Sequence, residues 1–250
     1  MSHKKIDPFS VSVTKLDLFF DKTLLACATG FFWQNGSKNY LVTNWHNVTG
    51  KNNITGQHLS KKTAAEPNRV EFDTYIERDP NRRLRVSIDL YRNAVPFWIE
   101  HPRFGKSVDV VCILLEGIEK NVVPINSHHL TNILKKIGSD VFIIGYPMGI
   151  DTSGFPIWKR GSIASEPDLD ADLLPLVYVD SLTIKGLSGS PVLLRQYQGE
   201  LSDGFQVLAG GQMNAIVGIY SGRVGTDDSL GWGLIQIHAD MMAARAIADK

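Results

Sequence analysis

The chain has 250 residues, 43% of them hydrophobic and 21% charged, and its 26 basic residues balance its 26 acidic ones. Because no net charge favours an anionic partner, the composition argues against nucleic acid and membrane surfaces as partners. Residues 1–8 lack the apolar core and cleavage site of a signal peptide, and no apolar run reaches the length of a membrane span. We therefore expect a cytoplasmic globular protein that is long enough to bury two cores.

Short apolar runs separated by turn residues dominate the first half of the chain. Residues 10–20 alternate imperfectly and are predicted as an opening strand or a docking arm. Asn35-Gly36 lies between two apolar runs, and this residue pair favours a tight hairpin turn. The predicted strands of this half are 10–20, 24–33, 40–43, 70–76, 84–90 and 108–115.

A helix is predicted between the two halves. Leu130, Ile133, Leu134 and Ile137 recur at helical spacing, and Gly138 follows them as a C-terminal cap. A helix at this point would separate the first set of strands from the second.

The predicted elements divide the chain into three parts. Residues 1–120 form a first barrel, residues 121–138 a linker with its helix, and residues 139–250 a second barrel that a helix over 238–248 closes. The strands of the second barrel are predicted at 141–147, 161–165, 176–180, 215–221 and 233–237.

One serine lies in a loop of small residues. Gly186, Gly189 and Pro191 surround Ser188, and a strand-like apolar run follows. A serine hydroxyl is a weak nucleophile unless a base can reach it. Taken alone, the loop is explained equally well as a plain turn before a strand.

A histidine and an acid upstream supply the missing partners. His46 follows a short apolar strand that ends at Thr43, and Asp109 opens the apolar run 110–115. A carboxylate that leads so apolar a run needs a partner, because burying an unpaired charge is costly. A histidine meets that need.

Three segments together resemble the chymotrypsin-like (trypsin-like) serine proteases, in particular the bacterial branch with the high-temperature-requirement and glutamyl endopeptidases. The segments are Thr43 to His46, Asp109 to Leu115 and Gly186 to Val192, and they occur in the order histidine, acid, serine. The resemblance implies an all-β fold of two packed six-stranded antiparallel β-barrels, with a linker helix and a C-terminal helix. It also implies a serine endopeptidase that acts on polypeptides through an acyl-enzyme intermediate and needs no cofactor.

By this resemblance Ser188 is the nucleophile, His46 the general base and Asp109 the group that orients it. The backbone N–H groups of Gly186 and Ser188 would form the oxyanion hole. Two positions depart from the family pattern. Leu187 replaces the acid that binds a newly cut N-terminus, which argues against that mode of activation, and Ser190 replaces a glycine.

The resemblance also locates the primary specificity pocket. Leu182 would lie at its base, and the absence of a carboxylate there argues against cleavage after Lys or Arg. An apolar or small side chain is the first expectation. Arg223 could hold an acidic side chain by a charge-assisted bond, or face solvent or pair with Asp227 or Asp228. The remaining predicted pocket residues are Thr183, Tyr220, Ser221 and Gly233.

Two other classes of protein compete with this interpretation. A catalytically silent relative would bind peptides through the same cleft. An α/β-hydrolase would use Ser188, Asp227 and His238, but Ser190 stands where that fold requires a glycine. The histidines show no metal-ligand spacing, so no metal is expected. A cytosolic protease needs restraint, and the sequence does not identify a regulatory partner protein.

Overall fold

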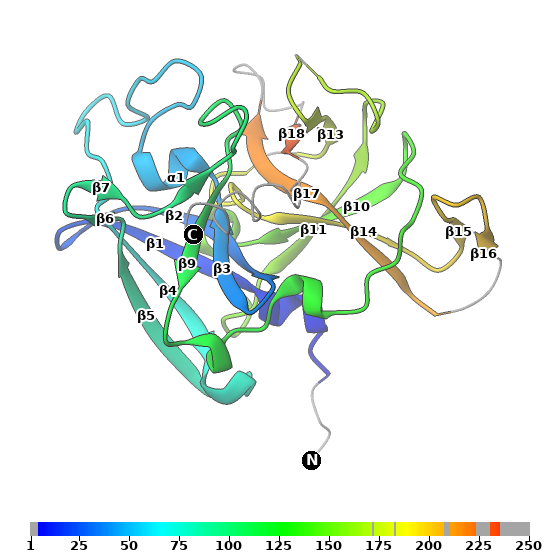
Figure 1. Ribbon diagram of the computed structural model, residues 1–250, viewed down its shortest axis with the longest axis horizontal. Coiled ribbons are helices and arrows are strands. Elements are labelled where there is room, and N and C mark those ends of the chain that lie inside the picture. The colour runs from blue at the N-terminus through cyan, green and yellow to red at the C-terminus, as the bar shows by residue number, and fades with distance from the viewer. Residues whose placement is uncertain (1–4, 172, 183, 208–210, 224–230, 236–250) are drawn as a thin grey trace.

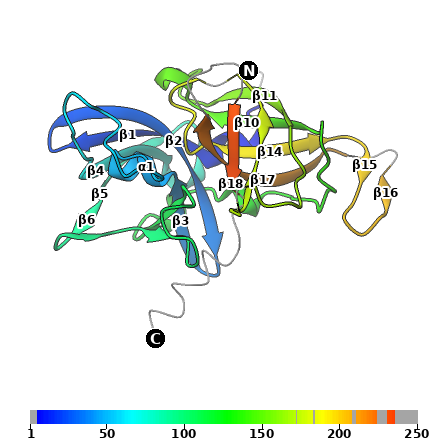
Figure 2. The same cartoon turned by 90° about the horizontal axis from the view of Figure 1, so that it is seen from above.

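Two antiparallel β-sheets form the framework of the part of the chain that the structure, a computed structural model, describes. That part comprises residues 5–171, 173–182, 184–207, 211–223 and 231–235. The two sheets lie next to each other, with the first half of the chain in one and the second half in the other (Figures 1 and 2). The all-β prediction is therefore confirmed for the described residues.

The N-terminal sheet has seven strands in the order β5-β4-β1-β2-β3-β9-β8. A hairpin turn at Asn35-Gly36 joins β2 to β3, as the sequence predicts. The predicted pair β4 and β5 is also present, with Val70 opposite Ile88. The strands of this sheet are β1 (Val13–Phe20), β2 (Thr23–Asn35), β3 (Lys38–Thr43), β4 (Arg69–Tyr75), β5 (Arg83–Asp89), β8 (Ile99–Glu100) and β9 (Val111–Leu115).

The C-terminal sheet also has seven strands, in the order β12-β18-β17-β14-β10-β11-β13. Its centre is β14, which follows the serine loop directly and pairs with β10 on one side and β17 on the other. The strands are β10 (Asp140–Gly145), β11 (Ile157–Ile163), β12 (Leu176–Val177), β13 (Val179–Asp180), β14 (Pro191–Gln196), β17 (Met213–Arg223) and β18 (Gly231–Ile235).

The sequence predicts six strands in each barrel, whereas each sheet has seven, because two-residue strands complete each sheet. In the described residues the end strands of each sheet pair on one side only, so each is a curled sheet and not a barrel closed by hydrogen bonds. Two further ribbons and several short turns lie outside the sheets. These are β6 (Tyr91–Arg92), β7 (Val95–Pro96), β15 (Gly199–Glu200), β16 (Gln206–Val207), η1 (Pro8–Ser12), η2 (Ile76–Arg78), η3 (Glu119–Asn121), η4 (Ile125–Ser127) and η5 (Pro147–Gly149).

The predicted linker helix is wrong. Residues 130–137 are extended or irregular, and Ile133 forms a bridge with Leu201. The backbone N–H groups of Thr131 and Leu134 donate to carbonyls of the second half instead of to their own preceding turn. Four apolar residues at helical spacing do not decide between helix and strand in so short a segment, because a short helix is marginal without packing that favours it.

Helix is scarce in the described residues. The α-helix there is α1 (Trp45–Thr49), a single turn after β3. The closing helix predicted over 238–248 lies outside the described residues. No helix that the structure describes is long and apolar enough to cross a membrane.

Three clusters of buried side chains hold the sheets together. One fills the N-terminal sheet around Phe32 and Phe72, and one fills the C-terminal sheet around Ile143 and Val192. The third lies between them and takes side chains from both halves, among them Phe31 from β2 and Leu193 from β14. The two halves therefore share a buried interface, across which the site described below is assembled.

Candidate active site

His46 lies in the first turn of α1, directly after β3. Asn44 precedes the helix in an extended conformation and makes no side-chain cap bond, while Gly50 ends the helix in the left-handed region. The helix thus begins where β3 leaves the sheet. It presents a half-buried histidine, with 17% of its side chain exposed, at the edge of the N-terminal half.

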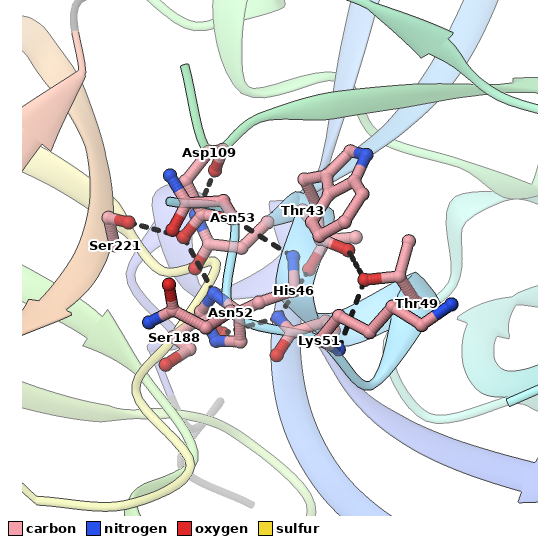
Figure 3. A network of polar contacts seen from close by, with 12 residues as sticks. Thr43, His46, Thr49, Lys51, Asn52, Asn53, Asp109, Ser188 and Ser221 are labelled. Carbon is pink, nitrogen blue, oxygen red and sulfur yellow. Dashed lines mark hydrogen bonds and ion pairs between the residues drawn. The ribbon is translucent and has the colours of Figure 1, made fainter. Parts of the chain in front are cut away.

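Asp109 holds His46 by two bonds. Oδ2 of Asp109 lies 2.6 Å from Nδ1 of His46, and Oδ1 accepts the backbone N–H of His46 at 2.9 Å (Figure 3). The acid is 3% exposed. The ring therefore has its Nδ1 committed to the acid, which leaves Nε2 as the nitrogen available for proton transfer.

Asp109 has further donors from both halves of the molecule. The hydroxyl of Ser221, on β17, donates to Oδ2, and Nδ2 of Asn44 donates to the backbone carbonyl of Asp109 at 2.6 Å. A buried carboxylate needs such donors, since unpaired charge is costly to bury. The sequence predicts Ser221 as a pocket residue and does not predict these contacts of Ser221 and Asn44. The dense polar run around His46, in otherwise apolar surroundings, was the available signal for Asn44.

The serine loop is tied to the N-terminal half through its backbone. The carbonyl of Ser188 accepts Thr29 N–H at 3.0 Å and Nδ2 of Asn47, on the histidine helix, at 3.2 Å. Gly189 has φ +89°, and a Cβ there would lie 2.0 Å from the Thr29 carbonyl. Only glycine allows the two halves to approach this closely.

The same loop is braced from the C-terminal side. Gly189 N–H donates to the Tyr220 carbonyl at 2.9 Å, and Tyr220 N–H donates to the Ser190 carbonyl at 2.8 Å. Leu187 is fully buried in the C-terminal core, which accounts for an apolar residue at this position. Ser190 is also fully buried, and its hydroxyl has no hydrogen-bond partner among the described residues.

The described contacts contain no hydrogen bond between the Ser188 hydroxyl and His46. Figure 3 shows both residues. Nδ2 of Asn47 links the histidine helix to the Ser188 carbonyl. Catalytic hydrogen bonds are often long in unliganded sites and tighten when substrate binds. The His46–Asp109 pair is formed in this structure, and the Ser188 carbonyl bonds to Asn47, one residue from His46.

Gly186 adopts a conformation that other residues avoid. Its φ is +94°, and an added Cβ would lie 2.4 Å from the Tyr146 carbonyl. The residue before it is anchored, because the Lys185 carbonyl accepts Met148 N–H at 2.6 Å. The turn at 146–149 therefore packs directly on the segment predicted to supply an oxyanion donor.

The predicted pocket residues are only partly described. The side chain of Leu182 is 61% exposed, and Tyr220 is buried. Lys159, on β11, donates through Nζ to the Leu182 carbonyl, and burial lowers the pKa of this ammonium group. Thr183 lies outside the described residues. For Arg223 (β17) and Gly233 (β18) only the backbone is described, so the pocket assignment remains a prediction.

Other reactive groups do not gather into a site. Within the described ranges, no three His, Cys, Asp or Glu side chains lie together as they would around a metal ion. Cys27 and Cys112 are free thiols. Burial raises the pKa of Cys112 to about 12, so this thiol is not a nucleophile near neutral pH.

Comparison with known proteins identifies the family. A model of the trypsin-like peptidase domain matches residues 28–201, which is more than half of the chain. No curated protein matches the sequence. Among solved structures, the serine endoprotease from Yersinia pestis matches 96% of this chain with a TM-score of 0.51 and 13% identity, which shows the fold alone.

Two other bacterial structures are similar to nearly the whole chain. The Rv3671c protease from M. tuberculosis, in its active form, covers 96% of this chain and 81% of its own, with a TM-score of 0.49 and 17% identity. The HtrA-type protease AlgW with a tripeptide covers 95% and 60%, with a TM-score of 0.49 and 13% identity. This chain spans 62% of the Yersinia pestis protein. The match over residues 28–201 shows that the chain belongs to the trypsin-like peptidase family.

Proposed function

We propose that the protein is a serine endopeptidase in which Ser188 attacks the peptide carbonyl, His46 transfers the proton and Asp109 orients His46. The observation that carries the proposal is the buried Asp109 carboxylate, which accepts both Nδ1–H and the backbone N–H of His46. Residues 1–120 would supply the base and the acid, and residues 139–250 the nucleophile.

The reaction follows from this arrangement. Oγ of Ser188 bonds to the carbonyl carbon while its proton passes to Nε2 of His46. The tetrahedral intermediate then collapses, the C–N bond breaks, and His46 returns the proton to the leaving amine. Water attacks the acyl-enzyme with His46 again as the base, which releases the acid product and restores Ser188. Asp109 stays ionised throughout and stabilises the imidazolium.

The negative oxygen of the intermediate needs donors. The backbone N–H groups of Gly186 and Ser188 are proposed for this role, and no described residue accepts a hydrogen bond from either of them. Removing one such donor typically costs about 10²–10³ in rate. The conformation of the loop is therefore as important as the hydroxyl that it carries.

The proposed substrates are polypeptides cleaved after residues other than Lys or Arg. A cationic side chain that enters a closed pocket loses hydration, which only a buried carboxylate restores. Leu182 offers none, and the ammonium of Lys159 on the Leu182 carbonyl adds a like charge. Apolar or small side chains are expected before the cleaved bond, with Glu or Asp as the second preference. A peptide library in which Lys or Arg dominates would overturn this assignment without affecting the triad.

Hydrolysis of fluorophore-labelled casein tests the proposal. The wild-type protein should release fluorescence, and Ser188→Ala should not, while its melting temperature stays within about 2 °C because the half-buried hydroxyl makes no described bond. Turnover that survives this substitution would refute the proposal.

A catalytically silent peptide-binding protein is the second candidate, because the described hydrogen bonds include none between the Ser188 hydroxyl and His46. Such a protein would bind casein peptides with equal affinity in the wild type and in Ser188→Ala, without cleavage in either. Turnover by the wild type excludes this candidate.

A further inference from the structure

We propose that the hydroxyl of Thr29 is a positioning group that sets the direction of the oxyanion donor at Gly186. The inference rests on the proposed function, because it assigns a role within that reaction. Thr29 lies on β2, in the N-terminal sheet, and is fully buried. It touches neither His46 nor Asp109 among the described hydrogen bonds, yet it contacts the serine loop of the other half at two points.

Every polar group of Thr29 that faces this loop is engaged. Its Oγ1 donates to the Gly186 carbonyl at 2.8 Å and accepts the Tyr146 N–H at 3.0 Å. Its backbone N–H donates to the Ser188 carbonyl at 3.0 Å. A single hydroxyl has one donor and two acceptor sites, so it can hold the loop and the Tyr146 turn at once.

These bonds fix two consecutive peptide groups. The Lys185 carbonyl is held by Met148 N–H, and the Gly186 carbonyl is held by Thr29. Because a trans peptide is planar, its N–H points opposite to its carbonyl. The anchored Lys185 carbonyl therefore fixes the direction of the Gly186 N–H, and the anchored Gly186 carbonyl prevents rotation on the other side of the residue.

Thr29 also holds the turn at 146–149, which anchors the Lys185 carbonyl. Tyr146, which bonds to the Thr29 hydroxyl, begins the turn that carries Met148, and Gly149 N–H closes that turn on the Tyr146 carbonyl at 2.9 Å. Without the hydroxyl, the Tyr146 N–H and the Gly186 carbonyl would lose a buried partner, which is unfavourable. The segment around Gly186 would then shift to form other hydrogen bonds. Gly186 can adopt many backbone conformations, so its own backbone would not prevent this shift.

Thr29→Val removes the hydroxyl and keeps the shape of the side chain. We expect kcat for p-nitrophenyl acetate to fall about 10- to 100-fold with KM within about twofold, since a donor displaced by about 1 Å loses much of its effect. The labelling rate with a fluorophosphonate probe should fall in parallel. Thr29→Ser restores the hydroxyl and should recover most of the rate.

Thr14→Val is the matched control. Thr14 is a buried threonine of β1 whose Oγ1 donates to the Asp73 carbonyl at 2.8 Å and makes no described hydrogen bond with the serine loop. It should lower the melting temperature as Thr29→Val does and leave kcat within about twofold. If Thr29→Val does not fold, Thr29→Ala is measured in the same way.

Two results would overturn the inference. One is a kcat for the Thr29 variants that matches that of Thr14→Val, and the other is a Thr29→Ser protein as slow as Thr29→Val. An inactive wild type that the fluorophosphonate probe does not label would instead refute the proposed function. In that case the loss of amide-hydrogen protection at Met148 in Thr29→Val, relative to Thr14→Val, still decides whether Thr29 holds the loop.

Discussion

Two arginines join the halves of the molecule, and they differ in what they contact. Arg195, on β14, lies between the rings of Phe9 and Trp158, with centroid distances of 5.5 and 4.4 Å. It also forms an ion pair with Asp7, at 2.8 Å from Nη1 to Oδ2, and only 14% of its side chain is exposed. These contacts of Arg195 with Asp7, Phe9 and Trp158, called the Arg195 clamp below, fasten the segment before β1 onto the C-terminal sheet.

Arg83, on β5, makes the corresponding contact near the serine loop. It lies over the rings of Tyr75 and Phe155, at 5.6 and 5.3 Å, and Nη2 donates to the Ser153 carbonyl at 3.1 Å. It is exposed and has no carboxylate partner among the described residues. Its partners Ser153 and Phe155, which with Tyr75 form the Arg83 clamp, follow the turn at 146–149 that anchors Lys185, whereas the ring and ion-pair partners of Arg195 make no described contact with that turn. We therefore expect that Arg195 holds the halves together and that Arg83 affects the alignment of the serine loop.

The largest loss of activity is expected from substitution of Asp109, which contacts His46 in the N-terminal half and Ser221 in the C-terminal half. Asp109→Asn should lower kcat about 10⁴-fold near neutral pH, because an amide favours the wrong tautomer of His46. Ser221→Ala removes only the contact from the C-terminal half and should cost about tenfold. Steady-state kinetics measures both. A loss below tenfold in Asp109→Asn would mean that another acid, such as Asp89, orients the base.

The Arg195 clamp should matter for stability and not for turnover. Arg195→Ala should lower the free energy of unfolding by about 2 kcal/mol, or about 4–8 °C in melting temperature, because it strands Asp7 and removes two ring contacts. The turnover of the folded variant should stay within about twofold of the wild type. Arg160→Ala, which removes an exposed ion pair with Asp140, is the control and should change the melting temperature by less than about 2 °C. Equal stability losses in Arg195→Ala and Arg160→Ala would show that the contacts of Arg195 stabilise the fold no more than an exposed ion pair does.

The Arg83 clamp should show the opposite pattern. An exposed cation–π contact stabilises by about 0.5–1 kcal/mol, so Arg83→Ala should leave the melting temperature within about 2 °C. Its kcat should fall about two- to fivefold, since up to about 1 kcal/mol of loop alignment is lost. Arg82→Ala, an exposed neighbour paired with Glu77, should change neither quantity. A large stability loss without a change in kcat would assign Arg83 to the same task as Arg195.

The smallest effect is a pH dependence of the Arg195 clamp. His128 lies 4.9 Å from the Phe9 ring, and Nε2 is 2.8 Å from the Ser12 hydroxyl. Burial lowers the pKa of His128, although Asp7 opposes this. The unfolded chain therefore binds the proton more readily, so stability should fall as pH drops below about 6.5. The melting temperature of wild type should decline more between pH 7.5 and 5.5 than that of His128→Gln. Parallel curves would contradict the expectation.

Local patterns in the sequence predicted most of the strands. The turn at Asn35-Gly36 and the pair β4 and β5 follow from alternation and turn chemistry, which act over a few residues. The helix predicted over 130–137 failed because the partner of Ile133 is Leu201, almost seventy positions on. Spacing in one segment carries no information about such a partner.

The same limit applies to the site. His46, Asp109 and Ser188 could be predicted because each lies in a distinctive short motif, and the structure brings the first two into contact. The contacts of Thr29 and Ser221 could not be predicted from the sequence. A threonine inside a strand and a serine near a strand end are common, so neither residue stands out. Their significance comes from bonds that join β2 to the serine loop and β17 to Asp109, which only the folded chain brings together.

The identity of the nucleophile is tested most directly by locating a covalent adduct. The protein is incubated with a fluorophosphonate probe, digested, and mapped by peptide mass spectrometry. We expect one phosphonyl adduct on Ser188, and no adduct on Ser188 in Asp109→Asn under the same short exposure, because the base is then misoriented. An adduct on another residue, or unchanged labelling of Ser188 in Asp109→Asn, would contradict the proposed triad.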